Sequence, residues 1–412
     1  MIDFMSKLPE MKTGDNLISA LSVTPKYDEN ICTQNQSIRL MALSDLYQVY
    51  VPSQMSIEIY NKLYLALLRS MQKKSSQMAI KQRYENYKAI QQQSYSGILG
   101  GSDSFTIIGT SGIGKSSAIS RAISLIAENR IIEIDKPYTK IISCLIVQCP
   151  FDSSVKGLLL EILRKIDEEI GTDNYSHVIR SRTATTDMLI GSVSSLALNH
   201  IGLLVVDEIQ NVVNSKNGKN LIGALTQLIN NSGISICMVG TPESTIFFEG
   251  AMQLARRSVG LQYTSLNYDD YFRNFCKLLF QYQYTANRIE ITDAIIEWLY
   301  EHSAGIISVV VSLIHDAQEL AIITGKEILN LDTLNEAYKQ RLSMLHEYIQ
   351  PSIIQNNSTS KKRDTKNKSV VTKSVKNREN FSFKDVAKKS KQENINVVEL
   401  LKEVCTVIEV SI

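Results

Sequence analysis

The residues with the clearest chemical potential run from Gly109 to Ser116 and fit the pattern G-x-x-x-x-G-K-S/T. They follow the apolar run 105–108 and lead into a helical pattern, which is the context that a phosphate-binding loop requires. Glycines allow a tight turn whose backbone N–H groups converge on phosphate oxygens, and the following helix adds partial positive charge. The stretch therefore predicts a nucleotide site, with an ordinary Gly/Ser turn as the alternative.

The motif predicts how the residues of this loop contact a nucleotide and its magnesium ion. Lys115 would reach the β- and γ-phosphates of the nucleotide, and Ser116 would bind Mg²⁺. The other contacts to the nucleotide are expected from Gly109, Thr110, Ser111, Gly112, Ile113, Gly114 and Ser117.

A pair of acidic residues, Asp207 and Glu208, follows a second apolar run at 201–206. That run is continuous and β-branched at its end, as expected of a strand buried on both faces. Asp207 would hold the metal shell through water, and Glu208 would polarise the attacking water. The structural alternative is that both acids cap the following helix, with Gln210 continuing a polar turn. The presence of Lys115 favours the catalytic interpretation.

Three further residues are candidates for the hydrolytic step. Thr241 follows an apolar run and precedes Pro242, where ATPases of the AAA+ class place a polar residue that senses the γ-phosphate. A strand-terminating turn is the alternative for Thr241. Arg256 and Arg257 follow a helix-like run and could serve as an arginine finger for a neighbouring subunit's nucleotide, or simply be solvated.

Apolar runs alternate with helical patterns in the middle of the chain. Strands are expected at 105–108, 141–147, 203–206 and 234–240, and helices at about 115–129, 153–170, 185–198 and 221–229. This alternation predicts parallel βαβ units and an α/β three-layer sandwich with a parallel sheet. Beyond about 265 the strand signal fades, and 291–324 is amphipathic helix with a break at Gly305, which predicts a separate helical domain.

Four segments are expected: an N-terminal helical and extended region (1–95), a nucleotide-binding core (96–264), a helical lid (265–350) and a flexible tail (351–412). Within the tail, residues 361–378 hold eight basic residues and one acidic residue. Because the whole chain has a net charge of +2, this run leaves the rest at −5. The run is either a solvated tether or a segment that binds a phosphate backbone. Residues 397–410 have the spacing of a helix that docks into a partner or packs on itself.

The composition favours a cytoplasmic protein over a membrane protein or a zinc protein. The 412 residues contain no run of about 18 apolar residues, and the first residues lack a signal peptide, so no membrane span is expected. The six cysteines are scattered without a Cys-x-x-Cys pair. We therefore expect a cytoplasmic protein with reduced thiols and no zinc site.

The segments between the two nucleotide motifs resemble the TnsC-type regulators of DNA transposition. Residues 149–159 read Cys-Pro-Phe-Asp-Ser-Ser-Val-Lys-Gly-Leu-Leu, and 165–175 read Lys-Ile-Asp-Glu-Glu-Ile-Gly-Thr-Asp-Asn-Tyr. They are similar to the family's Cys-Pro motif, Ser-x-Lys-Gly-Leu segment and Asp…Gly-Thr…Tyr stretch. Residues 205–210 and 239–243 also look like this family and its TniB relatives, and the resemblance covers roughly 44–348.

The resemblance implies an AAA+ ATPase that uses ATP and Mg²⁺ and assembles as a homo-oligomeric ring or filament on duplex DNA. It also implies a target-selecting partner of the TnsD/TniQ type and a transposase that the ATPase recruits or activates. The nucleotide roles fall to Lys115, Ser116, Asp207, Glu208 and Thr241. DNA contacts in related proteins come from loops that face the ring interior, which makes Ser154 and Lys156 candidates, although Lys156 could also be a solvated helix residue.

One position departs from the AAA+ pattern. Many lids of this class carry an arginine three residues after a glycine, whereas Gly305 is followed at that spacing by Ser308. Two other functions stay open: a STAND-type signalling scaffold switched by ATP without DNA, and a replication-initiator or helicase-loader ATPase. Neither an effector domain nor a winged helix is evident in the sequence. Glu208 argues against a switch that does not hydrolyse ATP.

Overall fold

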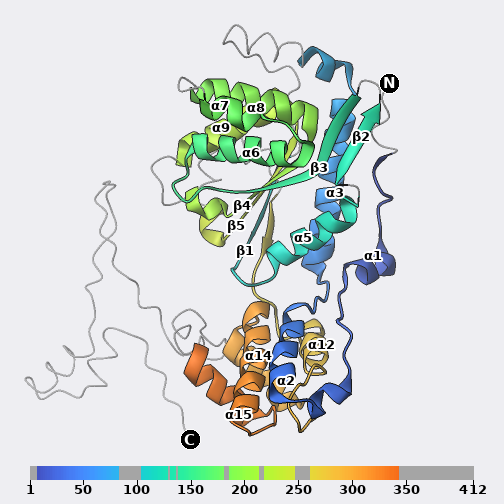
Figure 1. The fold of residues 1–412 in the computed structure, drawn as a ribbon, viewed down its shortest axis with the longest axis vertical. Helices are drawn as coiled ribbons and strands as arrows, with labels where there is room; N and C mark the ends of the chain where they lie inside the picture. The colour runs from blue at the N-terminus through green and yellow to red at the C-terminus, as the bar shows by residue number, and fades with distance from the viewer. Residues whose placement is uncertain are drawn as a thin grey trace, which may run out of the picture. The chain divides into compact units, whose positions relative to one another are not determined.

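The computed structural model describes residues 7–82, 104–128, 130–135, 138–180, 185–212, 218–245 and 260–342 (Figure 1). All of these belong to the first of two compact units, residues 1–358. The second unit, 359–412, carries the basic run and the predicted docking helix, and it lies outside the described residues.

A six-stranded sheet in the order β2-β3-β4-β5-β1-β6 forms the centre of the nucleotide-binding part. The strands are β1 (Phe105–Gly109), β2 (Ile131–Asp135), β3 (Tyr138–Gln148), β4 (Ile201–Asp207), β5 (Ser235–Gly240) and β6 (Leu261–Tyr263). All neighbours pair in parallel except β2 and β3, which are antiparallel. The four predicted strands are β1, β3, β4 and β5. The short edge strands β2 and β6 are additions that the apolar pattern did not predict.

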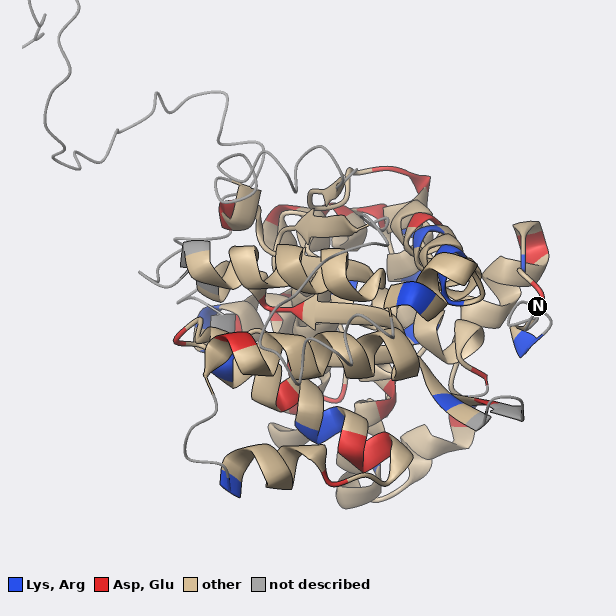
Figure 2. Cartoon of the chain, turned by 90° about the horizontal axis from the view of Figure 1, so that it is seen from above, with Lys and Arg blue, Asp and Glu red and all other residues tan. Residues whose placement is uncertain are grey.

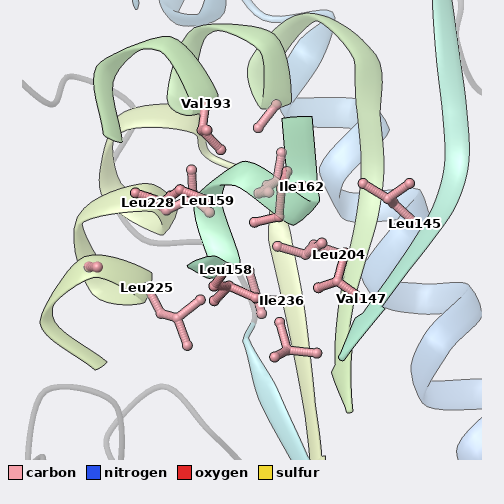
Figure 3. Close-up of a cluster of buried hydrophobic side chains, with 14 of the residues drawn as sticks. Leu145, Val147, Leu158, Leu159, Ile162, Val193, Leu204, Leu225, Leu228 and Ile236 are labelled. Atoms are coloured by element: carbon pink, nitrogen blue, oxygen red, sulfur yellow. The ribbon is translucent and has the colours of Figure 1, made fainter. Parts of the chain in front are cut away.

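Helices cover both faces of the sheet (Figure 1). One face carries α6 (Val155–Ile170), α8 (Thr186–His200) and α9 (Gly218–Ser232), and α7 (Asn174–Arg180) packs against α6. The other face carries α3 (Gln54–Lys74) and α5 (Lys115–Ile126), and α1 (Gly14–Leu21) contacts α5. Side chains of β4 alternate between the two layers, as a strand's two-residue period requires. Leu204 packs with α6, α8 and α9 (Figure 3), whereas Leu203 packs with α3 and α5. The predicted α/β three-layer sandwich is confirmed.

A helical lid follows the sheet in the chain. It contains α12 (Asp270–Leu279), α13 (Asp293–Ser303), α14 (Ile307–Ile323), α15 (Leu331–Ala337) and the π-helical turn η6 (Tyr338–Leu342). The predicted break falls at Gly305, where a Cβ atom would lie 2.1 Å from the carbonyl oxygen of Leu266, so only glycine fits. No single helix in the described ranges is long and apolar enough to cross a membrane, and α13 and α14 meet that criterion only as a pair bent by 120°.

The N-terminal residues are divided between the two parts. α1 and α3 contribute to the core that covers the sheet, whereas η2 (Glu29–Thr33), α2 (Gln36–Ala42) and η3 (Leu43–Tyr47) lie with the lid, where Leu43 and Leu46 are buried. Arg39 of α2 is 6% exposed and donates two hydrogen bonds to the carboxylate of Glu327, of 2.5 and 2.7 Å. The same guanidinium donates to the carbonyl oxygen of Tyr284. These hydrogen bonds from Arg39 lower the pKa of Glu327 and fasten the N-terminal segment to the lid.

We predict that Arg39→Met lowers the free energy of unfolding by about 2–4 kcal/mol, because it leaves the half-buried carboxylate of Glu327 without its cation. Lys326→Met is the matched control, since it removes an exposed ion pair with Glu336 in the same lid. Its cost should be about 0–1 kcal/mol. Chemical denaturation of the two variants measures the difference, and equal costs would contradict this account of the Arg39 pair.

Candidate functional site

The loop between β1 and α5 has the geometry of a phosphate cradle. Gly112 and Gly114 have φ values of +81° and +96°, which side chains with a Cβ rarely adopt. Gly114 is the N-cap of α5 and contributes no side-chain hydrogen bond to the helix. The N–H groups at the start of α5 are therefore without a side-chain cap, and they are the donors that phosphate oxygens need.

Lys115 is buried at the base of this loop. Its ammonium group donates to the carbonyl oxygens of Gly109 and Thr110, at 2.6 and 2.9 Å. Burial lowers the pKa of Lys115, and the opposing effect comes first from Asp207 and then from Glu208. The loop's own carbonyl groups thus hold the cation beside the acidic pair.

A hollow of about 250 Å³ connects the P-loop with the ends of β4 and β5. Because β1, β5 and β4 are adjacent and parallel, their carboxyl ends meet at one edge of the sheet. Most of the predicted nucleotide residues line this hollow: Ser111, Gly112, Gly114, Lys115, Ser116, Ser117, Asp207, Glu208 and Thr241. Three residues that were not predicted to bind nucleotide line it as well: Gln210, Gly240 and Ser308.

The chemistry of this hollow fits ATP with magnesium. The hydroxyl of Ser116 and the carboxylate of Asp207 are oxygen ligands, the kind that Mg²⁺ takes in phosphate sites. The cradle offers backbone N–H groups and one ammonium group to the phosphates. Asp207 also accepts a hydrogen bond of 2.8 Å from the backbone N–H of Glu208, which fixes the acidic pair at the strand end.

The carboxylate of Glu208 sits on strained backbone. Its φ is +58°, in the left-handed region, and its side chain accepts a hydrogen bond from the amide of Gln210 in the turn η4 (Ile209–Val212). Thr241 follows β5 and its hydroxyl hydrogen-bonds Glu243 in η5 (Pro242–Ser244), which lowers the pKa of Glu243. Glu208 and Thr241 therefore lie on the wall of the hollow contributed by the two strand ends.

The lid reaches the P-loop through Ser308. The backbone N–H of Ser308 donates to the carbonyl oxygen of Gly112 at 3.0 Å, and a Cβ on Gly112 would lie 2.3 Å from the Ser308 hydroxyl. Ile306, the N-cap of α14, gives that helix no side-chain cap. The lid thus presents a serine and a helix N-terminus to the phosphate hollow at the position where many AAA+ lids carry an arginine. The sequence singled out Ser308 only by its spacing from Gly305 and predicted no role for it.

A larger hollow of about 730 Å³ adjoins the P-loop and shares Gly112, Gly114, Ser116, Ser117 and Ser308 with the first. Ile113 lines it, and its walls come from residues 46–56, α5, α12 and α14. Most of its lining is apolar or aromatic, with Val49, Tyr50, Val51, Met55, Tyr271, Phe275 and Val311. Such a lining beside the P-loop suits the base and sugar of a nucleotide.

The other predicted site residues lie elsewhere. Ser154 and Lys156 line a third hollow of about 560 Å³, where α6, α8 and α9 begin. The Ser154 hydroxyl accepts a hydrogen bond of 3.1 Å from the N–H of Gly157 and so caps α6. Arg256 and Arg257 lie outside the described residues.

Residues 101–264 match the family model described as Bacterial TniB protein. This range contains the P-loop, the acidic pair and Thr241. No curated protein matches the sequence.

Solved structures that are similar to this one include the Orc1 protein of Aeropyrum pernix in complex with DNA, Drosophila ORC bound to DNA, and domain III of the Thermotoga maritima replication initiation protein DnaA. Their sequence identities are 12%, 13% and 13%, and their TM-scores are 0.41, 0.42 and 0.36. The matches cover 64%, 85% and 67% of this chain. This chain spans 65% of the Aeropyrum protein, 73% of the Drosophila protein and 94% of the Thermotoga domain.

The family match agrees with the resemblance that the motifs carry. The parallel sheet supplies the AAA+ core, and one hollow gathers the P-loop with Asp207 and Glu208. The chain is therefore an AAA+ P-loop ATPase, and its residues 101–264 are similar to the TniB family.

Proposed function

We propose that the chain is an ATP-dependent regulator of DNA transposition that works in the cytoplasm. With ATP bound it oligomerises on duplex DNA and links a target-selecting protein of the TnsD/TniQ type to the transposase; hydrolysis disassembles it. The observation that carries this proposal is the single hollow that brings together Lys115, Ser116, Asp207, Glu208 and Thr241 within the TniB-type core.

The nucleotide steps follow from the positions of these side chains. The ammonium of Lys115 exchanges the carbonyl oxygens of Gly109 and Thr110 for β- and γ-phosphate oxygens when ATP enters. Ser116 and Asp207 would hold Mg²⁺, whose charge stabilises the phosphate oxygens when it is bound. Glu208 polarises the attacking water from the opposite wall of the hollow.

Assembly controls hydrolysis in this proposal. Thr241, at the end of β5, positions the γ-phosphate between the acidic pair and the water. Arg256 or Arg257 of a neighbouring subunit supplies the positive charge that the transition state requires, so that a single subunit hydrolyses slowly.

DNA contact is proposed at the hollow where three helices begin. Ser154 and Lys156 line it, and the N-termini of α6 and α8 contribute partial positive charge. Figure 2 shows Lys and Arg interspersed with Asp and Glu along the helices of the described part of the chain. The basic run at 361–378 supplies a second, sequence-independent attraction to phosphates.

Lys115→Ala should weaken ATP binding at least about 30-fold, because the loop loses the buried cation that pairs with the phosphates. The Lys115→Ala variant should therefore not form the oligomers that require ATP. Lys277→Ala, an exposed lysine of α12, is the matched control and should bind ATP normally. Calorimetry and size-exclusion chromatography with ATP measure both effects, and normal ATP-dependent oligomers of Lys115→Ala would refute the P-loop assignment.

Glu208→Gln should bind ATP with wild-type affinity and hydrolyse it about 10²–10⁴-fold more slowly, because the amide cannot accept the water's proton. The protein should then persist on duplex DNA after a chase with competitor DNA. Phosphate release and the dissociation rate are the two measurements. Wild-type hydrolysis by this variant would show that another residue activates the water.

Removal of residues 359–412 should leave the rate of ATP hydrolysis within about twofold of the full chain, because the P-loop, the acidic pair and Thr241 all lie in the unit 1–358. The truncated chain should lose a contact with the transposase, measured by pull-down. Complete loss of hydrolysis would instead make the segment part of the ATPase fold.

A further inference from the structure

Gln210 lies between Glu208 and the end of β5. Its side-chain N–H donates to one carboxylate oxygen of Glu208. Its own side-chain oxygen is buried without a hydrogen-bond donor, and a Cβ at Gly240 would lie 3.2 Å from it. The amide of Gln210 is therefore packed against β5 while it holds one oxygen of the carboxylate that is proposed to activate water.

The turn that carries Gln210 is also tied to the loop before α6. The side-chain amide of Asn211 donates to the carbonyl oxygen of Cys149 at 3.0 Å. The hydroxyl of Ser153 donates to the backbone carbonyl of Asn211 at 2.9 Å, and Ser153 is fully buried. Between these two anchors, Phe151 is 91% exposed. One side of this loop is therefore hydrogen-bonded to the turn η4, and its outer side is open to a ligand.

Both ends of this linkage hold backbone strain. Glu208 and Ser153 have φ values of +58° and +51°, and they are two of four non-glycine residues with positive φ in the described ranges. Left-handed backbone is unfavourable for such residues, and so is the unpaired oxygen of Gln210. These costs favour any other arrangement of the turn that removes them, and a switch needs two arrangements of similar free energy.

We infer that Gln210 holds Glu208 away from the attacking water until a ligand on the loop 149–156 displaces the turn. The displacement passes through the hydrogen bonds of Asn211 with Cys149 and Ser153. Gln210 is then a positioning residue that keeps hydrolysis slow until the ligand arrives. The identity of that ligand, the backbone of duplex DNA, rests on the proposed function, on Ser154 at the end of this loop and on Lys156 in the first turn of α6.

The test compares steady-state ATP hydrolysis of the full chain with and without duplex DNA, for the wild type and Gln210→Ala. Without DNA, kcat of Gln210→Ala should rise about tenfold, because a hydrogen bond to a charged group is lost. KM for ATP should change less than about twofold, and DNA should stimulate the variant little further. Gln340→Ala is the matched control, since Gln340 also donates to a glutamate, Glu336, on an exposed part of the lid.

A fall in kcat of Gln210→Ala would overturn the inference, because it would mean that Gln210 itself positions the water. Unchanged kcat would overturn it as well. Ser153→Ala tests the linkage: DNA stimulation should fall at least about threefold while DNA affinity stays within about twofold. Full stimulation of that variant would contradict coupling through Ser153.

Fluorescence anisotropy of labelled duplex DNA in the same samples separates the two proposals. If the wild type binds no DNA, the proposed function fails, whereas a raised kcat of Gln210→Ala still supports the hold on Glu208. If the wild type binds DNA and Gln210→Ala turns over like the wild type, the inference fails and the proposed function stands.

Discussion

The parallel pairing of β1, β5 and β4 is the constraint on which the ATPase site depends. Ile108 pairs with Gly240, and Val206 pairs with Met238, so the three strands end at the same edge of the sheet. That register brings Lys115, which follows β1, beside the acids that follow β4. A shift of one residue in either pairing would exchange the side chains that face the two helical layers, so the core and the site are fixed together.

Around this edge, the nucleotide hollows are completed by segments far apart in the chain. Gly112 accepts a hydrogen bond from Ser308 of the lid, and Tyr271 donates to the carbonyl oxygen of Val51. Because Arg39 joins the N-terminal segment to the lid, these walls are parts of one packed structure. Ser308 of the lid therefore lines both hollows together with glycines of the P-loop.

The sequence predicts those features that local pattern determines. Continuous apolar runs identify β1, β3, β4 and β5, and the glycine spacing identifies the P-loop. It does not predict the edge strands, because β6 has only three residues and the short apolar run of β2 is interrupted by Glu133 and Asp135. Gln210, Ser308 and the larger hollow were missed for another reason: their roles depend on contacts between distant segments, such as Tyr271 with Val51. The positions of Arg256, Arg257 and the basic run stay predictions.

The proposed function requires that ATP gates assembly on DNA. Its most direct test is duplex-DNA binding by the purified full chain with a slowly hydrolysed ATP analogue, with ADP and without nucleotide, each over a series of salt concentrations. Tight binding is expected with the analogue alone, and it should weaken as salt rises because phosphate contacts release counterions. Absence of DNA binding in every nucleotide state would contradict it and favour a protein scaffold switched by ATP.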